Sequence, residues 1–218
     1  MENMSTKKNT PEPTLRRLPR YLHLLLRLRE GGMTEVSSTV LAKELTLDPT
    51  QVRKDIEYTE IIGKPKTGYN IEKLISAIKD FLSWDNNNKA VLVGVGHLGT
   101  AMLGYGNFKT YGLNFVAAFD TNPDKVATEV QGVPVHSLHK LPEIAKKEEI
   151  KYGVLTVPPQ YAQFVAEMMI EGGVKAIWNF APAQLKLPDN IVVENAQLTQ
   201  SLAVLSRKYV ELMEREDI

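Results

Sequence analysis

The patterned part of the chain begins with apolar residues at helical spacing. The stretch TLRRLPRYLHLLLRLREGG places leucines on one helical face and ends on a glycine pair. The leucines of this face are Leu18, Leu22, Leu25 and Leu26. Apolar residues three and four positions apart are typical of an amphipathic helix, and glycine marks its end. We therefore expect a helix that starts near Thr14 and stops at Gly31.

Two short helices joined by a tight turn are expected next. The run SST at 37–39 offers caps for a helix that extends through Leu45. In LTLDP, Asp48 is a cap and Pro49 takes the first position of a second helix. This helix turns Val52 and Ile56 inward. It is expected to expose its polar and basic residues, namely Thr50, Gln51, Arg53 and Lys54.

This arrangement is the helix-turn-helix pattern. A helix fits the major groove, its first residues reach base edges, and nearby cations neutralise phosphates. The following GKPKTGYN can form a β-hairpin wing with Lys64 and Lys66, where Gly68 permits the turn. A plain helical hairpin with a solvated basic face is the alternative that the pattern leaves open.

A change of pattern marks a second domain. Residues 71–88, IEKLISAIKDFLSWDNNN, predict an amphipathic helix and then a polar linker. After the linker, KAVLVGVGHLGTAM combines a buried strand with glycines that open a helix. Gly94, Gly96 and Gly99 would allow a tight turn, close approach of the backbone to a pyrophosphate, and packing of helix on strand. The free N–H groups of the helix favour that anion.

The next strand strengthens the prediction of a dinucleotide site. It reads LNFVAAFD and ends at Asp120, 21 residues beyond Gly99. A carboxylate at this place binds the adenine ribose hydroxyls, and its charge repels a 2′-phosphate, so NAD is favoured over NADP. Strands and helices then alternate, which predicts a doubly wound parallel sheet. Ligands lie beyond the carboxyl ends of such strands, so residues 156–159 and 179–182 are expected at the pocket rim.

The last helix carries an apolar stripe at helical spacing. Its members are Leu198, Leu202, Leu205, Tyr209 and Leu212. This stripe fits packing on its own domain and packing on a partner equally well.

Composition and charge narrow the class of protein. The chain of 218 residues has no cysteine and equal numbers of acidic and basic residues, 26 each. Residues 1–70 hold 12 Lys and Arg against 9 Asp and Glu, so the basic charge lies near the helix-turn-helix. No apolar run is long enough for a membrane span, and the start is neither apolar nor a signal peptide. A reducing cytoplasm is expected.

The histidines give little support for an enzyme. His97 would face the pyrophosphate, where the helix dipole disfavours imidazolium, so hydrogen bonding is expected there rather than catalysis. His136 and His139 are spaced as a metal pair but lack a third ligand nearby, and His23 lies among leucines. No separate substrate domain follows the nucleotide domain. We therefore expect neither an active site nor a metal site.

Taken together, these segments resemble the Rex family of bacterial redox-sensing transcriptional repressors. The resemblance runs from about Thr14 to about Tyr209 and rests on motifs in matching order: TLRRLPRYL, SSTVLAKEL, DPTQVRKDI, VGVGHLG, AAFD, LTVPPQYAQ and NFAP. It implies a homodimer with a swapped C-terminal helix, which binds an inverted-repeat DNA operator. It also implies that NADH releases the operator, whereas NAD+ permits DNA binding.

The resemblance completes the set of expected site residues. The cofactor NADH or NAD+ would be held by Gly94, Gly96, His97, Leu98, Gly99, Tyr105, Asp120, Thr156, Val157, Pro158, Asn179 and Phe180. DNA would be contacted by Ser38, Thr50, Gln51, Arg53, Lys54, Lys64, Lys66 and Tyr69. A switch between redox states would involve Arg16, Arg17 and Gln197.

The sequence departs from the family at several of these places. His97 stands where Asn is usual, Pro65 and Lys66 interrupt the basic wing, and Glu57 occupies a position where Ser is common. Gln197 replaces an Asp that is thought to exchange ion-pair partners with the redox state. A neutral hydrogen bond is about half as strong as a charged one, so we expect a paralogue with a weakened NADH response or an altered operator preference.

The expected architecture is an α/β chain with four parts. A flexible arm spans 1–13, a winged-helix DNA-binding domain 14–84, a Rossmann-like domain 85–196 and a dimerisation helix 197–218. A small NAD-dependent oxidoreductase and a regulator of another nucleotide, such as an acyl-CoA, remain the alternatives.

Overall fold

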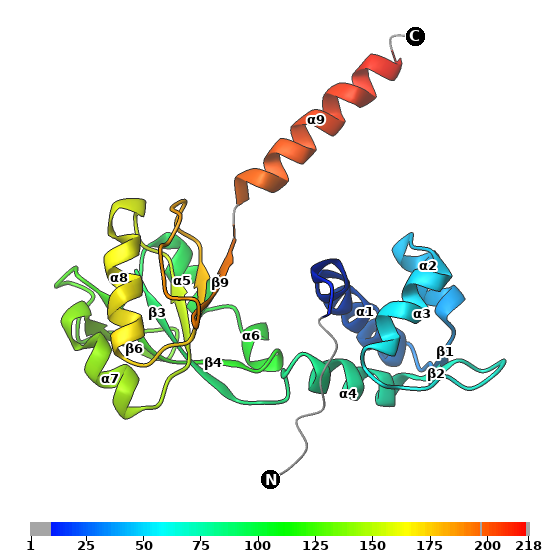
Figure 1. The fold of residues 1–218 in the computed structure, drawn as a ribbon, viewed down its shortest axis with the longest axis horizontal. Coiled ribbons are helices and arrows are strands. Elements are labelled where there is room, and N and C mark those ends of the chain that lie inside the picture. Colours follow the sequence, from blue (N-terminus) through cyan, green and yellow to red (C-terminus); the bar gives the residue numbers. More distant parts are fainter. Residues whose placement is uncertain (1–9, 197, 217–218) are drawn as a thin grey trace. The chain divides into compact units, whose positions relative to one another are not determined.

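A computed structural model describes residues 10–196 and 198–216 of the chain (Figure 1). The chain divides into two compact units, Met1–Asp85 and Asn86–Ile218. Each unit has its own set of buried side chains, and each is described by itself below.

The first unit is a small helical domain with a short antiparallel strand pair. Its elements are α1 (Glu12–Glu30), β1 (Glu35–Val36), α2 (Ser38–Leu45), α3 (Pro49–Glu57), β2 (Tyr69–Asn70) and α4 (Ile71–Phe81). Leu18, Leu22 and Leu25 of α1 are fully buried, together with Val52 and Ile56 of α3. This confirms the inward residues of α3 and three of the four leucines predicted for the buried face of α1. The fourth, Leu26, is half-buried, and Leu24 is buried in addition. The helix begins at Glu12, slightly before the expected start.

Capping residues set the bounds of α2 and α3, as the sequence predicts. The Ser37 side chain accepts a hydrogen bond from the Val40 N–H at the start of α2. The Asp48 carboxylate accepts from the N–H groups of Thr50 and Gln51, and Pro49 follows at the first helical position. These bonds pair N–H groups that have no partner inside a helix. They lower the pKa of Asp48 below its ordinary value.

The predicted wing is confirmed as a short hairpin. Lys64 and Gly68 exchange backbone hydrogen bonds of 2.7 and 2.9 Å, and β2 then pairs with β1 in antiparallel register. Gly68 has a φ of +90°, and a Cβ there would clash with the Val36 carbonyl oxygen. Glycine is therefore required where the wing returns to the strand pair.

The second unit is built on a seven-stranded sheet in the order β5-β6-β4-β3-β7-β8-β9. Its strands are β3 (Asn88–Val93), β4 (Leu113–Asp120), β5 (Glu129–Val130), β6 (Val133–Ser137), β7 (Tyr152–Leu155), β8 (Ala176–Asn179) and β9 (Val192–Asn195). Its helices are α5 (His97–Leu103), α6 (Asn107–Thr110), η1 (Leu138–Lys140), α7 (Leu141–Lys147), α8 (Pro159–Glu171) and α9 (Leu198–Glu216).

Both faces of the sheet are covered, which confirms the doubly wound class. Val91 and Phe119 point to one face, where α7 and α8 pack. Leu92 and Ala118 point to the other, where Met102 of α5 packs. Successive residues of a strand face opposite sides, so continuous apolar runs such as AVLV are expected when both sides are buried. Figure 1 shows α7 and α8 together beside the sheet.

One edge of the predicted parallel sheet carries an additional antiparallel strand, which the sequence does not predict. β5 pairs antiparallel with β6 through a two-residue turn at Gln131 and Gly132. Both residues have positive φ, 53° and 79°, as the mirror-image turn of a tight hairpin requires. Glutamine is unusual in the first of these positions, and the strand has only two residues. For these reasons the pattern of the sequence does not predict this hairpin.

The C-terminal helix α9 forms as expected, and its apolar stripe is open to solvent in the single chain. Leu202, Leu205, Tyr209 and Leu212 are each more than half exposed. Among the described helices, none is long and apolar enough to cross a bilayer.

Candidate DNA-binding and nucleotide-binding sites

The exposed face of α3 carries a cluster of DNA-binding candidates. The Arg53 guanidinium lies 3.2 Å from Thr50 Oγ1 and 3.4 Å from Ser38 Oγ of α2. Thr50, Arg53 and Lys54 are exposed and Ser38 is half-buried. The structure therefore brings Ser38, Thr50 and Arg53 together on one surface, with Lys54 next to Arg53 along the helix.

Gln51 corrects the expectation that the polar residues of α3 are all exposed. It is half-buried, and its amide nitrogen donates to Asp55 Oδ1 over 2.8 Å. Asp55 itself is fully buried. It also accepts hydrogen bonds from the side chains of Thr14, Arg17 and Tyr21 on α1.

The ionised form of Asp55 is favoured by these donors. Burial alone raises the pKa of a carboxyl, but hydrogen bonds from Arg17, Tyr21, Gln51 and Thr14 outweigh it and hold the Asp55 pKa below its ordinary value. The same contacts raise the pKa of Arg17, while burial and Asp55 raise that of Tyr21.

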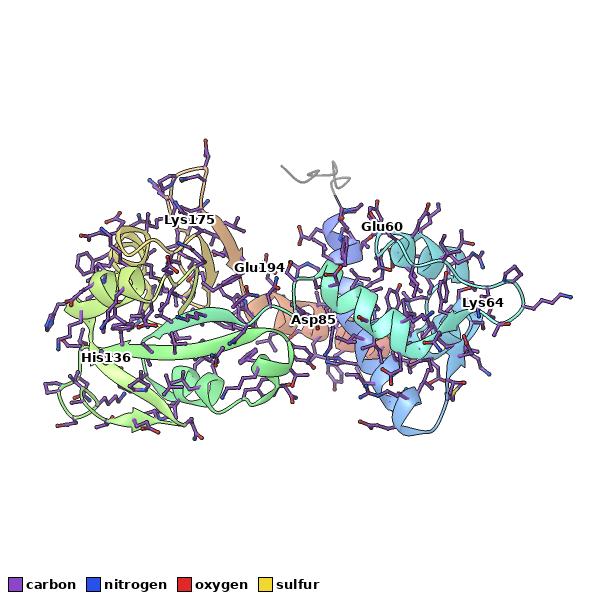
Figure 2. All side chains as sticks on the ribbon, turned by 90° about the horizontal axis from the view of Figure 1, so that it is seen from below. Glu60, Lys64, Asp85, His136, Lys175 and Glu194 are labelled. Atoms are coloured by element: carbon purple, nitrogen blue, oxygen red, sulfur yellow. The ribbon has the colours of Figure 1, made fainter. Side chains whose placement is uncertain are left out.

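The wing adds further cations beside this surface. Lys64 and Lys66 are exposed on the hairpin, and Figure 2 labels Lys64 there. Lys66 adopts a φ of +66° at the tip. At the base of the wing, the Tyr69 ring packs against Gly63, within 3.0 to 3.3 Å of where a Cβ would stand. Burial raises the pKa of Tyr69, so its hydroxyl stays protonated at neutral pH.

In the second unit, each glycine after β3 has a distinct steric role. Gly94 has a φ of +98°, and a Cβ there would lie 2.7 Å from the Thr156 carbonyl oxygen. A Cβ on Gly99 would clash with the Gly94 oxygen, whereas one on Gly96 would meet nothing within 4 Å. Gly94 and Gly99 are therefore needed for packing. Gly96 faces open space, which is the property needed where a ligand approaches the backbone.

Two side chains hold this glycine turn, one at the end of β4 and one from the segment that follows it. Asp120 Oδ2 accepts from the Val95 N–H at 2.8 Å, and Lys125 Nζ donates to the Val95 carbonyl at 2.6 Å. Lys125 also lies 3.8 Å from the Asp120 carboxylate. The Asn122 N–H donates to the other Asp120 oxygen. Each carboxylate oxygen has two lone pairs, so both oxygens retain capacity for a ribose hydroxyl.

An open pocket of about 610 Å³ lies beside the turn. It is lined by Val95, Gly96, His97, Thr100, Ala101, Gly104, Lys125 and Gln131. The residues from α5 lie on one helical face, and Lys125 and Gln131 come from the segment between β4 and β6. Of the expected cofactor residues, only Gly96 and His97 line this pocket. Asp120 adjoins it through Val95 and Lys125.

The other expected cofactor residues are distributed around the turn. Thr156 Oγ1 donates to the carbonyls of Val93 and Gly94 over 3.0 and 2.8 Å. The Val157 side chain would lie 2.9 Å from a Cβ on Gly94. Pro158 is exposed and caps α8. Leu98 is exposed on the first turn of α5.

Asn179 is the expected cofactor residue with the clearest structural role. It is buried, its amide nitrogen donates to Asn195 Oδ1 and to the Ala183 carbonyl, and its oxygen accepts from the Ala181 N–H. These bonds fix the loop that follows β8.

Tyr105 and Phe180 lie at two ends of a row of aromatic rings. Tyr105 contacts Phe108 edge-on with ring centroids 5.0 Å apart. Phe108 contacts Trp178 at 5.7 Å, and Trp178 contacts Phe180 at 4.7 Å. Tyr105 is half exposed. The row links the two residues expected near the nicotinamide and offers Trp178 as a fluorescent reporter.

The expected switch arginines both have carboxylate partners on their own domain. Arg17 forms a two-pronged ion pair with Asp55, and Arg16 pairs with Glu12 at the helix surface. Gln197 lies outside the described residues. The switch assignment of these three residues therefore stays a prediction.

His136 and His139, which are spaced as a metal pair, have other neighbours in the structure. His139 Nδ1 bonds the Ser137 hydroxyl at 2.8 Å, and His136, labelled on β6 in Figure 2, lies against the Phe119 ring. No group of three His, Cys, Asp or Glu side chains in residues 10–196 and 198–216 has a metal-binding arrangement.

Comparison with known proteins relates both parts of the chain to described families. The family described as "CoA binding domain" matches residues 85–183, and that described as "Putative DNA-binding protein N-terminus" matches residues 9–56. The redox-sensing transcriptional repressor Rex of Treponema denticola is 42% identical over 202 residues, covering 93% of this chain and 96% of the relative. Rex of Bacteroides fragilis is 43% identical over 201 residues, covering 92% and 90%.

The chain belongs to the Rex family.

Solved structures of a Rex protein agree with the fold of this chain. RSP, described as a Rex-family repressor, is 30% identical with a TM-score of 0.85 and covers 96% of this chain and 99% of its own. RSP in complex with beta-NAD+ and operator DNA has a TM-score of 0.87, is 30% identical and covers 95% and 96%. The resemblance and the α/β fold class predicted from the sequence are thereby confirmed. The Rex relatives are named as repressors rather than as enzymes, which agrees with the expectation that this chain has no active site.

Three residues in or beside the candidate sites are not predicted from the sequence, namely Lys125, Gln131 and Asp55. Lys125 and Gln131 come close to the glycine turn only through the fold, and no spacing rule points to them. Asp55 did carry a signal, because it stands between Val52 and Ile56 on the inward side of a predicted helix. A carboxylate in such a position needs partners, and the structure shows them.

Proposed function

We propose that this Rex-family chain is a DNA-binding transcriptional repressor that senses the NADH/NAD+ ratio and releases its operator when NADH binds. The observation that carries the proposal is the presence of two sites in one chain. One is an exposed basic helix face with a wing, and the other is a glycine turn whose Val95 is held by Asp120. Each has the chemistry for its ligand.

The proposed DNA surface comprises Ser38, Thr50, Arg53, Lys54, Lys64, Lys66 and Tyr69. Arg53 is the strongest candidate for base contact because it is exposed at the middle of α3 and arginine pairs with guanine through two hydrogen bonds. The wing lysines fit phosphate contacts, which add affinity without sequence preference.

The proposed cofactor residues are those expected from the sequence, with Lys125 and Gln131 added. Gly96 gives a pyrophosphate access to the backbone, and Asp120 is placed for the adenine ribose. Tyr105 and Phe180 would lie near the nicotinamide. RSP has been solved in complex with beta-NAD+ and with beta-NADH, which supports these two dinucleotides as the ligands of this chain.

The proposal extends to assembly and place of action. An inverted-repeat operator needs two recognition helices related by a two-fold axis, so we propose a homodimer that uses α9. We propose the cytoplasm as its location, because a bacterial repressor meets its DNA and cofactor there. The proposed parts are the arm 1–13, the winged-helix domain 14–84, the nucleotide domain 85–196 and the dimerisation segment 197–218.

Fluorescence anisotropy of a labelled duplex with inverted TTGTGA-like half-sites tests the function. The protein is titrated alone, with NAD+ and with NADH. We expect tight binding that NADH reverses and NAD+ does not. Binding that neither cofactor changes would contradict redox sensing and would agree with a switch weakened by Gln197. Absence of binding at low salt would contradict the repressor itself for this operator class.

A regulator of a CoA compound is the second candidate, favoured by the match of residues 85–183 to the CoA binding domain. Competition decides between them, with energy transfer from Trp178 to NADH as the signal. CoA that displaces NADH at comparable concentration would favour this candidate. We expect no displacement. An oxidoreductase would instead show turnover in NADH absorbance with candidate substrates.

A further inference from the structure

The proposed recognition helix α3 is anchored through a buried carboxylate. Asp55 is fully buried, and a buried charge is costly unless it is paired and hydrogen-bonded. We call the residues that satisfy it the Asp55 cluster: Asp55, Thr14, Arg17, Tyr21 and Gln51. Three of them come from α1, so the cluster ties the recognition helix to the first helix of the domain.

The geometry of the cluster fixes α3 in more than one direction. Arg17 Nε donates to Asp55 Oδ2 over 2.6 Å, and its Nη2 donates to Oδ1 over 2.8 Å. A planar guanidinium fork allows little rotation of the carboxylate that it binds. The Tyr21 hydroxyl donates to Oδ2 at 2.6 Å and the Thr14 hydroxyl to Oδ1 at 2.9 Å. Both partners are buried.

Gln51 stands where recognition helices often carry a base-reading residue, yet it is turned inward. Its amide nitrogen donates to Asp55 Oδ1 at 2.8 Å, one helical turn further along α3. A glutamine reads adenine through both its donor and its acceptor. Here one of the two N–H groups of the amide is already committed to a buried carboxylate, which would lose that partner if the amide turned to a base.

We propose that Asp55 is a positioning residue for DNA recognition and that Gln51 supports it rather than reads bases. Through Arg17, Tyr21 and Thr14, Asp55 sets the orientation at which Arg53 and Lys54 meet the DNA. The inference rests on the proposed function of α3 as the recognition helix. It predicts that a change at Tyr21, which has no exposed surface, alters sequence selectivity.

The test uses the full chain and a duplex selected from a random library by the wild-type protein. Operator affinity, affinity for an unrelated duplex, salt dependence and melting temperature are measured for each variant. Tyr21→Phe removes the hydroxyl and keeps the ring. Gln51→Ala removes the proposed support, and Arg53→Ala removes the proposed base contact. Ile78→Val, in the buried face of α4, is a matched control that destabilises the same domain without touching the cluster.

The expected results distinguish a role of the cluster in positioning α3 from a role in the stability of the domain alone. Tyr21→Phe loses about threefold to tenfold of its selectivity for the operator, the range of one hydrogen bond. Its affinity for the unrelated duplex and its salt slope stay at wild-type values, because phosphate contacts are intact. Gln51→Ala loses less than about threefold, whereas Arg53→Ala loses about tenfold or more. Ile78→Val keeps full selectivity at a similarly lowered melting temperature.

Two outcomes would overturn the inference while leaving the proposed function intact. One is a Tyr21→Phe variant whose selectivity equals that of Ile78→Val. The other is a Gln51→Ala variant that loses as much operator affinity as Arg53→Ala. A wild-type protein that selects no duplex at all would overturn the proposed function, and this inference with it. Asp55→Asn is a further variant, and if it does not fold, Tyr21→Phe and Gln51→Ala still decide.

Discussion

Lys125 and Asp120 both form hydrogen bonds with the backbone of Val95. Lys125 bonds the carbonyl of Val95 and Asp120 bonds its N–H. The first peptide groups of the glycine turn are therefore held by the last residue of β4 and by a side chain from the segment that follows it. The ammonium 3.8 Å from the carboxylate also offsets part of its charge. A turn held in its binding shape loses less entropy when a ligand binds.

Lys125→Met is therefore expected to weaken NADH binding by about tenfold, corresponding to roughly 1.4 kcal/mol. Methionine keeps the length of the side chain but leaves the Val95 carbonyl without this donor. Lys175→Met is the matched control, because Lys175, labelled in Figure 2, is exposed just before the amino end of β8, whereas the glycine turn follows the carboxyl end of β3 in the same parallel sheet. Trp178-to-NADH energy transfer measures the affinity. Equal affinity for both variants would show that Lys125 does not hold the turn for the ligand.

Asp55 makes the stability of the winged-helix domain depend on pH. Its pKa is lowered in the fold, so its stabilising contribution is present above the unfolded-state pKa of about 3.9 and is lost as pH falls through the folded-state pKa. Asp55→Asn removes this titration and breaks the ion pair with Arg17. We expect a loss of about 3 kcal/mol at pH 7.

Urea unfolding of wild type and Asp55→Asn between pH 7 and pH 3 measures this effect by circular dichroism. The two stability curves should approach each other below about pH 4, because only the wild type loses the Asp55 contribution there. Curves that stay parallel over the whole range would mean that the buried carboxylate does not titrate between the folded and unfolded states in this window.

At the scale of elements, two glycines in the turn between β3 and α5 have different roles. Gly99 is needed for packing, and Gly96 is proposed to let the ligand approach the backbone. Gly99→Ala brings a Cβ against the Gly94 oxygen and within 3.1 Å of Leu92. We expect a loss of about 1–3 kcal/mol in the stability of this unit. Gly96→Ala adds its methyl to open space, so stability stays unchanged while NADH binding is lost.

Thermal unfolding and NADH titration of the two variants form one experiment, in which each variant is the control of the other. If Gly96→Ala binds NADH as tightly as the wild type does, the pyrophosphate does not bind at this turn. A Gly99→Ala variant as stable as Gly96→Ala would show that the backbone shifts freely around the turn.

Helices and strands can be predicted from the sequence where a local signal marks them, such as a helix cap or a continuous apolar run. Ser37 and Asp48 cap helices, and AVLV and VAAF are continuous apolar runs between covered faces. β5 was missed because its two residues carry no alternation, and its turn uses Gln131 in place of the usual Asn. The short strand β5 is stabilised by its pairing with β6. A short window of sequence does not show that pairing.

The sites were predicted less completely than the elements, for a related reason. Glycines and Asp120 follow a motif with fixed spacing, so they could be named in advance. Asp55 and Arg17 are 38 residues apart, and Lys125 meets Val95 from 30 residues away. Pairings of this kind arise from tertiary packing, and they turned Gln51, an expected base reader, toward the interior.

At the scale of the whole molecule, the apolar stripe on α9 has side chains that the single chain leaves exposed. Leu202, Leu205 and Tyr209 are 60%, 65% and 61% exposed. Burying an apolar side chain of this size contributes about 1.5–3 kcal/mol, and a stripe with spacings of three and four fits against another element. A second copy of the chain supplies such an element and also the second recognition helix that an inverted repeat requires.

Leu202→Asp combined with Leu205→Asp is accordingly expected to convert a dimer into a monomer and to abolish tight binding to the inverted repeat. The loss should be about 100-fold or more, because two linked contacts become one, whereas affinity for a single half-site should stay at the wild-type value. Sedimentation and anisotropy measure the two effects. Gln200→Asp with Ala203→Asp, on the opposite side of α9, adds the same charge without touching the stripe and should remain dimeric. If the stripe variant stays dimeric and binds the inverted repeat as the wild type does, α9 packs within its own chain and the two-fold contact lies elsewhere.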